Sequence, residues 1–196
     1  MEDYITSYLK QGIILREKLI CGFQKDIIHI AQTIFTCFEN GGKLLICGNG
    51  GSAGDAQHIA AELVNRYRRE RSPLPALALT TDTSVITAIS NDYSYDLIFT
   101  KQVQALAQKG DCLLAISTSG TSENVNNALV CARQSGCVTI SLTGKDGGRM
   151  PSLSDISLIV PSDETPLIQE IHLVIEHLIC DLIEQKVIEN NHISNE

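Results

Sequence analysis

The chain contains no tryptophan, and its aromatic residues account for only 5% of the 196 positions. So few rings leave no stacking platform for the bases of single-stranded nucleic acid. Basic residues are also scarce, because 15 lysines and arginines stand against 23 acidic residues and give a formal net charge of -8. Such a field repels both a nucleic-acid backbone and an anionic membrane surface. We therefore expect no nucleic-acid or membrane partner.

Long apolar runs and paired cysteines are absent as well. No apolar stretch approaches the roughly 20 residues that cross a bilayer, and the first residues, MEDYITSY, are acidic and lack a basic-then-apolar signal. The seven cysteines are odd in number and include no C-x-x-C pair; Cys47, Cys112 and Cys137 lie in or beside apolar runs. These features predict a cytoplasmic protein whose thiols stay reduced and act as small core residues.

From residue 43 onward, short apolar runs alternate with amphipathic segments. The apolar runs predict strands at 44–47, 76–79, 112–116, 138–142 and 156–160. The segments between them predict helices at about 52–67, 84–90, 97–107 and 123–134. Five strands separated by helices form a parallel sheet with helices on both faces, in which ligands gather at the carboxyl ends of the strands. We therefore predict a single α/β domain at 41–188.

Helical patterns flank this sheet on both sides. Residues 1–40 carry apolar side chains at helical intervals and predict two helices, the second ending at Gly41 and Gly42. Their apolar surface is large, so we expect them to cover the core or to pack against another subunit. A closing helix is predicted from Thr165 to about Val187, and residues 189–196 are predicted to form a polar tail.

The segment after the first strand joins a glycine-rich turn to the start of a helix. Residues 48–51 (GNGG) allow a tight turn, and the helix behind them points free N–H groups at the loop, as an anion site requires. Ser52 and Asp55 also fit an ordinary N-cap pair, which accounts for the motif equally well. The dinucleotide fingerprint G-x-G-x-x-A is present, but the acid expected about 20 residues on comes only at Asp82. Gly-Lys-Ser/Thr is missing, so a nucleoside triphosphatase P-loop is not supported.

A second loop, STSGTS at 117–122, follows the strand at 112–116 and opens onto a predicted helix. Its hydroxyls and the helix N–H groups could hold a phosphate without any lysine, although serine-rich loops are also ordinary turns and caps. Both loops would end at the same edge of the sheet. We therefore favour phosphate or sugar binding there.

Two helices carry the side chains that could do chemistry. His58 and Glu62 lie four residues apart on the helix after the first loop and face the same side, as a proton-transfer or metal pair would. On the closing helix, Gln169 and His177 share an i, i+8 row. Burying such polar groups without partners costs on the order of 1 to 3 kcal/mol each, although a hydrogen-bonded core histidine is the plainer alternative.

The remaining charged residues near these motifs are predicted to be peripheral. His172 and Glu176 lie off the row of Gln169 and His177, and we expect them at the helix surface or at an interface. The basic run at 66–71 is predicted to be a solvated helix end.

Five segments together carry a family resemblance: CGNGGSAGDAQHIAAEL, AISNDY, ISTSGTSENV, LTGKDGG and IQEIHLVIEH. In these motifs, between about residues 40 and 185, the chain resembles the phosphoheptose isomerases, which are the sedoheptulose 7-phosphate isomerases of the sugar isomerase (SIS) domain family. The resemblance implies the SIS fold, in agreement with the five-stranded sheet predicted above. It also implies a homotetramer with active sites at the subunit interfaces.

Carried over position by position, the resemblance assigns roles to individual residues. It implies that Glu62 and His177 are catalytic. It implies that the substrate is bound by Asn49, Gly50, Gly51, Ser52, Glu62, Arg66, Asn91, Asp92, Ser117, Thr118, Ser119, Ser122 and Gln169. It implies one zinc ion per subunit, with His58, Glu62, Gln169 and His177 as ligands.

The implied activity is an aldose–ketose isomerisation. Sedoheptulose 7-phosphate becomes D-glycero-D-manno-heptose 7-phosphate through an enediol, as the first step of bacterial heptose (ADP- or GDP-heptose) biosynthesis. Because a zinc ligand is a poor free base, either Glu62 and His177 exchange roles during turnover or the metal acts as a Lewis acid. Whether the product feeds lipopolysaccharide, capsule or glycoprotein is left open.

Two other functions remain as alternatives. One is a non-catalytic SIS protein of the kind that binds the replication initiator, which would share the fold without needing an acid and a base. The other is an isomerase of a different phosphosugar. The retained set of His58, Glu62, Gln169 and His177 favours an enzyme, because such groups are costly to bury without a role.

Overall fold

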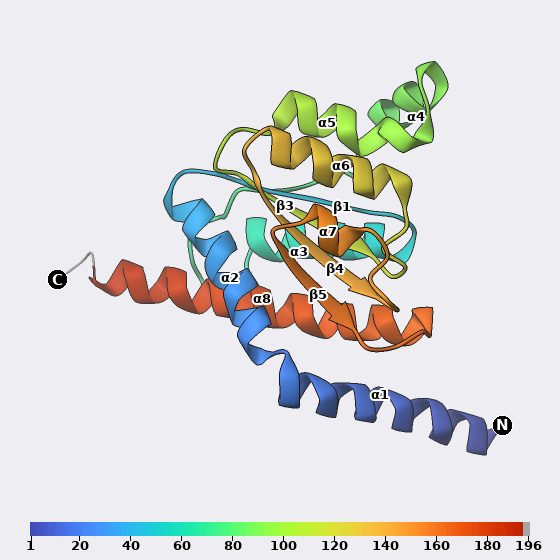
Figure 1. Cartoon of the computed structure of the whole chain (residues 1–196). Helices are drawn as coiled ribbons and strands as arrows, with labels where there is room; N and C mark the ends of the chain where they lie inside the picture. Colours follow the sequence, from blue (N-terminus) through green and yellow to red (C-terminus); the bar gives the residue numbers. More distant parts are fainter. Residues whose placement is uncertain (194–196) are drawn as a thin grey trace.

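A five-stranded parallel sheet forms the centre of the molecule (Figure 1). The computed structural model describes residues 1–193, and the side chains of residues 1–190. The strand order is β2-β1-β3-β4-β5. The strands are β1 (Leu44–Gly48), β2 (Ala76–Ala78), β3 (Cys112–Ser117), β4 (Val138–Gly144) and β5 (Ile156–Val160). All five predicted strands are confirmed, as is the α/β class with helices on both faces of the sheet.

Helices cover both faces of this sheet, so the fold has three layers. The helical elements are α1 (Glu2–Gly22), α2 (Gln24–Glu39), α3 (Gly51–Val64), α4 (Thr83–Asp92), the 3₁₀ turn η1 (Tyr95–Leu97), α5 (Ile98–Leu106), α6 (Glu123–Gln134), α7 (Met150–Leu153) and α8 (Thr165–Ile193). Successive strand residues point to opposite faces. Leu44 and Ile46 of β1 therefore pack with α2, α3 and α8, whereas Leu45 and Cys47 pack with α5 and α6.

The chain leaves the two central strands in opposite directions. β1 and β3 are neighbours, with Gly48 opposite Ile116. β1 continues into α3 on one face of the sheet, whereas β3 continues into α6 on the other face. Diverging connections of this kind open a crevice at the carboxyl ends of the strands, which is where ligands bind in open α/β sheets. The two loops predicted from the sequence, 48–51 and 117–122, both lie at this point.

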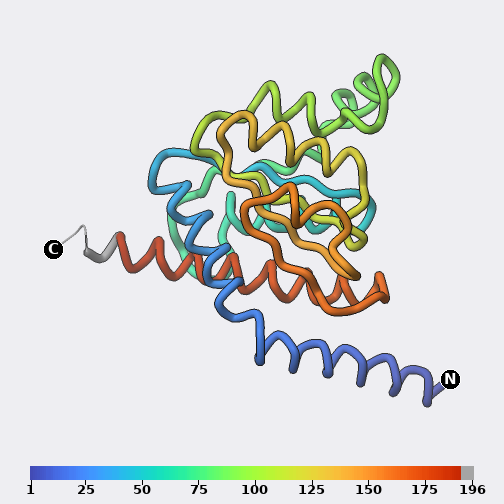
Figure 2. The backbone as a smooth tube through the Cα atoms, in the orientation of Figure 1, coloured from blue at the N-terminus to red at the C-terminus, as the bar shows by residue number. Residues whose placement is uncertain are grey.

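The two N-terminal helices are confirmed, but they are buried to different degrees. α2 covers the core with Ile27, Ile30 and Ile34. α1 is anchored to the body by Leu15 and Leu19, and its N-terminal part projects away from it (Figure 2). Along this projecting helix an apolar stripe is exposed, consisting of Ile5, Leu9, Ile13 and Ile20.

Several element boundaries differ from the predictions. α3 ends at Val64, so the run at 66–71 is a loop instead of a solvated helix end, and its Arg71 is only 8% exposed. α8 continues to Ile193, so the first part of the predicted tail is helical, and residues 194–196 lie outside the described residues. α7 and η1 were not predicted, because helices of one turn carry little periodicity.

Within residues 1–193, no helix is long and apolar enough to cross a membrane.

His172 and Glu176 are not at the surface, contrary to the prediction. They are 0% and 1% exposed, because α8 packs against α2, α3 and the sheet together and buries most of its circumference. The His172 Nε2–H donates to the Thr143 carbonyl at 3.0 Å, and burial lowers the pKa of His172 to about 4. Neither carboxylate oxygen of Glu176 has a hydrogen-bond partner among the described residues.

The Glu176 carboxyl is therefore held in its neutral form. Burial raises its pKa to about 9, and the charge of Asp55 on α3 contributes in the same direction. Burial also raises the pKa of Asp55 to about 6. A buried acid that binds a proton in the folded state, and loses it on unfolding, makes stability depend on pH.

We predict that Glu176→Gln makes the free energy of unfolding less dependent on pH. The folded pKa of Glu176 lies above the unfolded value, so its contribution to stability is full below about pH 4.5 and is lost as pH rises toward 9. Between pH 5 and 8 the native chain should lose on the order of 2 to 4 kcal/mol more than the variant. Urea unfolding across this range measures the difference, with the exposed Glu164→Gln as control. Parallel pH profiles for the native chain and Glu176→Gln would contradict the prediction.

Candidate functional site

The first loop is shaped by close packing between the end of β1 and the start of α3. A Cβ atom on Gly48 would lie 2.6 Å from the Ser52 carbonyl oxygen, so no larger residue fits there. Gly50 has a φ of 57°, a left-handed conformation that favours glycine. Ala53 N–H donates to the Gly50 carbonyl at 3.1 Å, which leaves the amides of Gly51 and Ser52 ahead of the hydrogen-bonded part of the helix. Free amides at a helix N-terminus are suitable donors for an anion.

The predicted N-cap pair of Ser52 and Asp55 is wrong. The N-cap residue is Gly50, which makes no side-chain cap, and Ser52 lies in the first turn of α3 with its side chain buried. The left-handed turn at Gly50 starts the helix two residues earlier than a serine cap would. One oxygen of Asp55 is buried and has no hydrogen-bond partner in the part of the chain that the structure describes.

The two loops are tied together by a pair of asparagines. The Asn49 amide donates to Asn124 Oδ1 at 2.8 Å, and Asn124 donates back to Asn49 Oδ1 at 2.9 Å. The Tyr95 hydroxyl donates to the same Asn49 oxygen at 3.0 Å. Asn49, which was predicted to bind substrate, therefore also holds the first loop against the start of α6.

Four of the five hydroxyls in the second loop bond to one another, and two of them also accept N–H groups of the loop. Ser117 Oγ lies 3.1 Å from Ser122 Oγ and accepts from the Gly120 N–H at 3.2 Å. Ser119 Oγ lies 2.8 Å from Thr121 Oγ1. Gly120 has a φ of 65°, and a Cβ atom there would lie 1.8 Å from the Gly147 carbonyl oxygen. The loop is therefore a fixed concave turn at the N-terminus of α6, consistent with anion binding by hydroxyl and N–H donors.

His58, Glu62 and His177 form a cluster between α3 and α8. His58 Nε2 lies 3.1 Å from Glu62 Oε1, and the ligand atoms of all three residues lie within 4.8 Å of one another. The His58 and His177 rings meet edge to face at 4.9 Å. Two imidazoles and a carboxylate in partly exposed positions can bind a metal ion or transfer protons.

The environment of His177 favours its neutral form. Burial lowers the pKa of His177, the charges of His58 and Arg68 act in the same direction, and Glu62 opposes them. The Tyr67 ring stacks on the His177 ring, with centroids 5.4 Å apart and an interplanar angle of 29°. A neutral, sterically held imidazole can both accept and donate a proton near neutral pH.

Four of the residues predicted from the resemblance make other contacts in the single chain. Arg66 is exposed and its Nε lies 3.7 Å from Glu70. Asn91 donates to Asp92 at 2.9 Å at the exposed end of α4. The amide of Gln169 lies against Gly51, about 10 Å of helix rise before His58. The structure thus brings three of the four expected metal ligands together and places Gln169 at the first loop.

Residues not predicted from the sequence also contribute to the site. Tyr67 contacts His177, and Asn124 orients Asn49. Asp181 and Glu184 could have been found from the sequence. Together with His177 they follow an i, i+4, i+7 spacing, which places all three on one face of α8. The loop at 65–71 packs on this face through Asp181 and Glu184.

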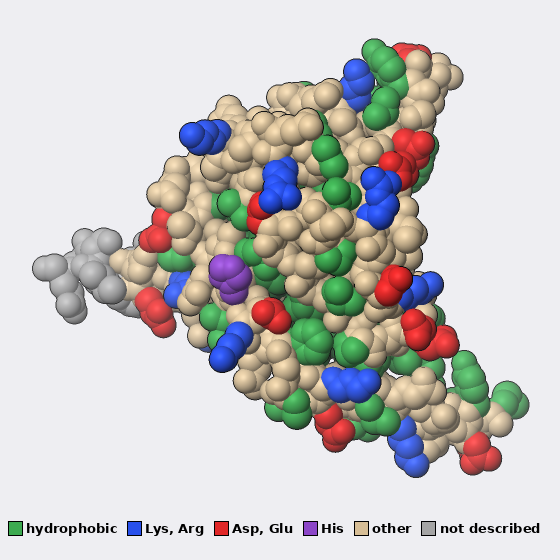
Figure 3. Space-filling view, viewed as in Figure 1, with side chains coloured by type: hydrophobic (Ala, Val, Ile, Leu, Met, Phe, Trp, Pro, Cys, Tyr) green, Lys and Arg blue, Asp and Glu red, His purple; other side chains and the backbone are tan. Residues whose placement is uncertain are grey.

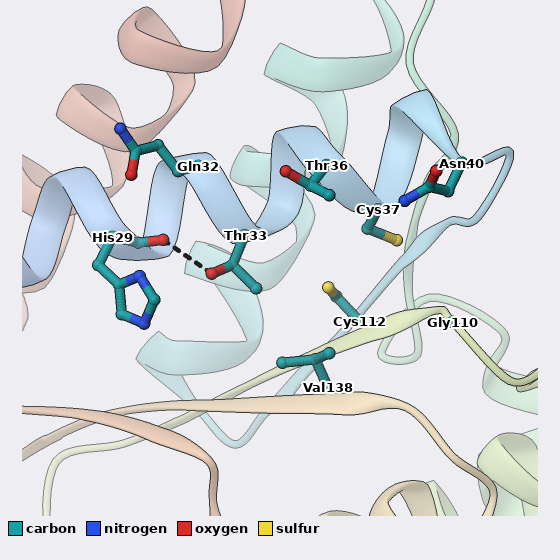
Figure 4. A pocket seen from close by; sticks show the side chains of 9 residues that line it. All are labelled: His29, Gln32, Thr33, Thr36, Cys37, Asn40, Gly110, Cys112 and Val138. Atoms are coloured by element: carbon teal, nitrogen blue, oxygen red, sulfur yellow. Dashed lines mark hydrogen bonds between the residues drawn. The ribbon is translucent and has the colours of Figure 1, made fainter.

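A separate cleft of about 430 Å³ lies at the opposite, amino-terminal edge of the sheet. It is lined by α2 and by the start of β3 and β4, and the sulfur atoms of Cys37 and Cys112 face each other there (Figure 4). All seven cysteines are free, and Cys47, Cys112 and Cys137 are buried, as predicted. Burial raises the pKa of Cys47 to about 12 and that of Cys137 to about 11.

Comparison with known sequences gives close relatives over nearly the whole chain. The model of the SIS domain family matches residues 7–144. The phosphoheptose isomerase of Trichlorobacter lovleyi is 51% identical over 185 residues, which is 94% of either chain. That of Aliarcobacter butzleri is 56% identical over 170 residues, covering 87% of this chain and 90% of the relative.

Solved structures give the same result. The phosphoheptose isomerase of Francisella tularensis superimposes with a TM-score of 0.90 at 44% identity, covering 93% of this chain and 97% of that one. The Neisseria gonorrhoeae phosphoheptose isomerase gives a TM-score of 0.89 at 41% identity, covering 94% and 98%. The chain therefore belongs to the phosphoheptose isomerases of the SIS domain family and is an enzyme of the phosphosugar isomerase class.

Proposed function

We propose that this enzyme converts sedoheptulose 7-phosphate to D-glycero-D-manno-heptose 7-phosphate, the first step of bacterial heptose biosynthesis. The observation that carries the proposal is the cluster of His58, Glu62 and His177, which places a carboxylate and an imidazole within reach of one bound carbon skeleton. The names of the relatives support a sugar phosphate as the substrate class. The alternative of a non-catalytic SIS protein is set aside by the membership established above.

The reaction moves one hydrogen from C1 to C2 of the sugar. Glu62 removes a proton from C1 while the C2 carbonyl oxygen gains one, which gives an enediol. Return of a proton to C2, with loss of the O1 proton, leaves the aldehyde at C1. His177 suits proton exchange at O1 and O2, because its lowered pKa keeps it neutral and able to act in either direction.

The two strand-end loops supply the binding energy that positions these carbons. We assign the phosphate to the hydroxyls and N–H groups of residues 117–122, with Ser52 contributing from the first turn of α3. Ser52 and His58 are separated by six residues of one helix, or about 9 Å of rise, which a seven-carbon chain can span. Remote binding of the phosphate then holds C1 and C2 against the base.

A zinc ion fits the same cluster. The donor set of two imidazole nitrogens and a carboxylate oxygen is one that zinc accepts, and the ligand atoms are already within 4.8 Å of one another. We propose that His58, Glu62 and His177 hold one ion per subunit; Gln169, the fourth ligand implied by the resemblance, lies at the first loop in the single chain and is not part of this set. When bound, the ion would supply Lewis-acid polarisation of the substrate oxygens.

The projecting helix supports assembly into a homotetramer with active sites at subunit interfaces. Hydrophobic side chains follow α1 along the arm at the lower right of Figure 3, where Ile5, Leu9 and Ile13 are exposed. Such a stripe is typical of a helix that packs against another chain. In one chain, Arg66, Asn91 and Asp92 make other contacts. Assembly would allow these residues to complete the site of a neighbouring subunit.

The purified enzyme is expected to convert sedoheptulose 7-phosphate to an aldose heptose 7-phosphate. Proton and carbon NMR of the mixture would show the loss of the C2 ketone and the appearance of C1 aldose signals. Incubation in D₂O should place deuterium at C2, because the proton returned there comes from a base in contact with solvent. Turnover of other ketose phosphates with no turnover of the heptulose would contradict the substrate assignment.

We predict that Glu62→Gln lowers kcat by about 10² to 10⁴-fold, because it removes the base and keeps the shape of the side chain. Binding of the sugar phosphate, measured by calorimetry, should change little because the phosphate loops are untouched. The exposed Glu164→Gln, which makes the same chemical change outside the site, serves as control. Full activity of Glu62→Gln would refute the mechanism.

The zinc assignment predicts that metal content depends on His58. Protein prepared without chelator should contain close to one zinc per chain, and His58→Ala should lose most of it, because one ligand of a site with few donors is removed. Elemental analysis measures this directly. His29→Ala, which removes an exposed histidine on α2, should retain the metal. Equal zinc content in the two variants would refute the assignment.

A further inference from the structure

The loop at 65–71 is held by a single buried carboxylate on α8. Glu184 is 0% exposed. Its Oε1 accepts the Tyr67 N–H at 3.0 Å, and its Oε2 accepts the N–H groups of Arg68 and Arg69, both at 2.9 Å. Burial opposes the ionisation of Glu184, but these donors and Arg71 outweigh it and keep its pKa below the usual value. Three consecutive backbone amides therefore converge on one anion, an arrangement of strong, charge-assisted hydrogen bonds.

Arg71 connects the same loop to the end of α3. Its Nη2 donates to the Glu62 carbonyl at 2.7 Å, and its Nη1 donates to the carbonyls of Leu63 at 2.6 Å and Asn65 at 3.1 Å. These are the carbonyls that a helix leaves without partners at its C-terminus. The Arg71 Nε lies 3.7 Å from Glu184 Oε1, so the two buried charges compensate each other.

The loop fixed in this way contacts the candidate catalytic residues on both helices. At one end, Arg71 binds the backbone of Glu62 itself. In the middle, the Tyr67 ring stacks on His177. Asp181, one turn before Glu184 on the same face of α8, lies 3.5 Å from Arg69 and adds a second ionic contact. The geometry of Glu62 relative to His177 thus depends on a loop that touches both.

We propose that Glu184 is a positioning residue of the active site: by binding the amides of residues 67–69 and pairing with Arg71, it fixes Tyr67 against His177 and holds the Glu62 end of α3. The inference rests on the proposed roles of Glu62 and His177. Among the described residues, Glu184 binds residues 67–69 and Arg71, none of which is assigned to the substrate. It acts through Tyr67 and Arg71, in the way that supporting contacts generally hold catalytic groups in a productive geometry.

The chain offers a matched control for a variant of Glu184. Asp111 is also a buried carboxylate, and it accepts the N–H groups of Lys43 at 2.9 Å and Gln108 at 2.7 Å and pairs with the Lys43 Nζ at 2.6 Å. It lies just before β3, at the edge of the sheet opposite the crevice. Asp111→Asn and Glu184→Gln therefore disrupt the same kind of buried network. Only the network of Glu184 contacts the loop at 65–71.

We expect Glu184→Gln to lower kcat at least tenfold and to change KM less than threefold, because the phosphate loop at 117–122 is separate from the loop at 65–71 that Glu184 holds. Hydrogen exchange of the amides at 67–69 should accelerate at least tenfold in this variant. Asp111→Asn should keep kcat within threefold and leave these amides protected. If Glu184→Gln retains kcat within threefold although the amides exchange freely, or if Asp111→Asn loses as much activity, the inference is overturned.

Variants of Tyr67 test the same inference without disturbing a buried charge, and they decide it if Glu184→Gln fails to fold. Tyr67→Leu removes the ring that stacks on His177 and should lower kcat at least tenfold, whereas Tyr67→Phe keeps the ring and should rescue most of that loss. Equal activity of Tyr67→Leu and the native enzyme would overturn the inference.

One readout separates this inference from the proposed function. The nuclear Overhauser contact between the Tyr67 and His177 rings needs no substrate. It should be present in the native protein and in Asp111→Asn and lost in Glu184→Gln. If the native protein does not convert sedoheptulose 7-phosphate, the proposed function fails, while this contact still decides whether Glu184 positions His177. Persistence of the contact in a folded Glu184→Gln variant would overturn the inference.

Discussion

Helix α8 packs along α3 on one face of the sheet, and residues separated by more than a hundred positions meet in the seam between them. His58 and Glu62 come from α3, and His177 comes from α8. Because both helices are also packed on the sheet, their relative position is set by the core and not by the polar residues that use it. Glu176 is buried near Asp55 of α3, whereas His172 is buried against Thr143 of β4. The candidate chemistry and the buried Glu176 carboxyl are therefore both found where α8 meets α3.

The crevice at the strand ends depends on a second constraint, which is how closely backbones approach one another. Gly48 allows α3 to begin directly behind β1, and Gly120 allows the serine loop to contact Gly147. With side chains at these positions the two loops would be pushed out of the crevice. The asparagine pair of Asn49 and Asn124 then fixes the loops to each other. The hydroxyls and N–H groups of the two loops consequently lie together at the strand ends.

The buried carboxyl groups of this molecule are found in two different environments. Glu184 and Asp111 are fully hydrogen-bonded to backbone amides and paired with a cation, so both stay ionised and hold loops in place. Within residues 1–190, Glu176 has no such donors, so burial keeps it protonated. The difference lies in whether a loop turns its N–H groups toward the carboxylate. Only the first arrangement can anchor a segment of the active site.

The sequence alone was sufficient for the five strands, most helices, the two strand-end loops and the pair of His58 and Glu62, because periodicity and local spacing specify these features. The spacing on α8 also suggested His177. The sequence could not show which polar side chains of α8 face the core, and so His172 and Glu176 were wrongly expected at the surface. Nor could it show that Gly50 starts α3, or that Glu184 captures the loop that was predicted as a helix end. Those outcomes depend on which helices pack together and which backbone donors face a buried anion, and only the tertiary structure decides such long-range contacts.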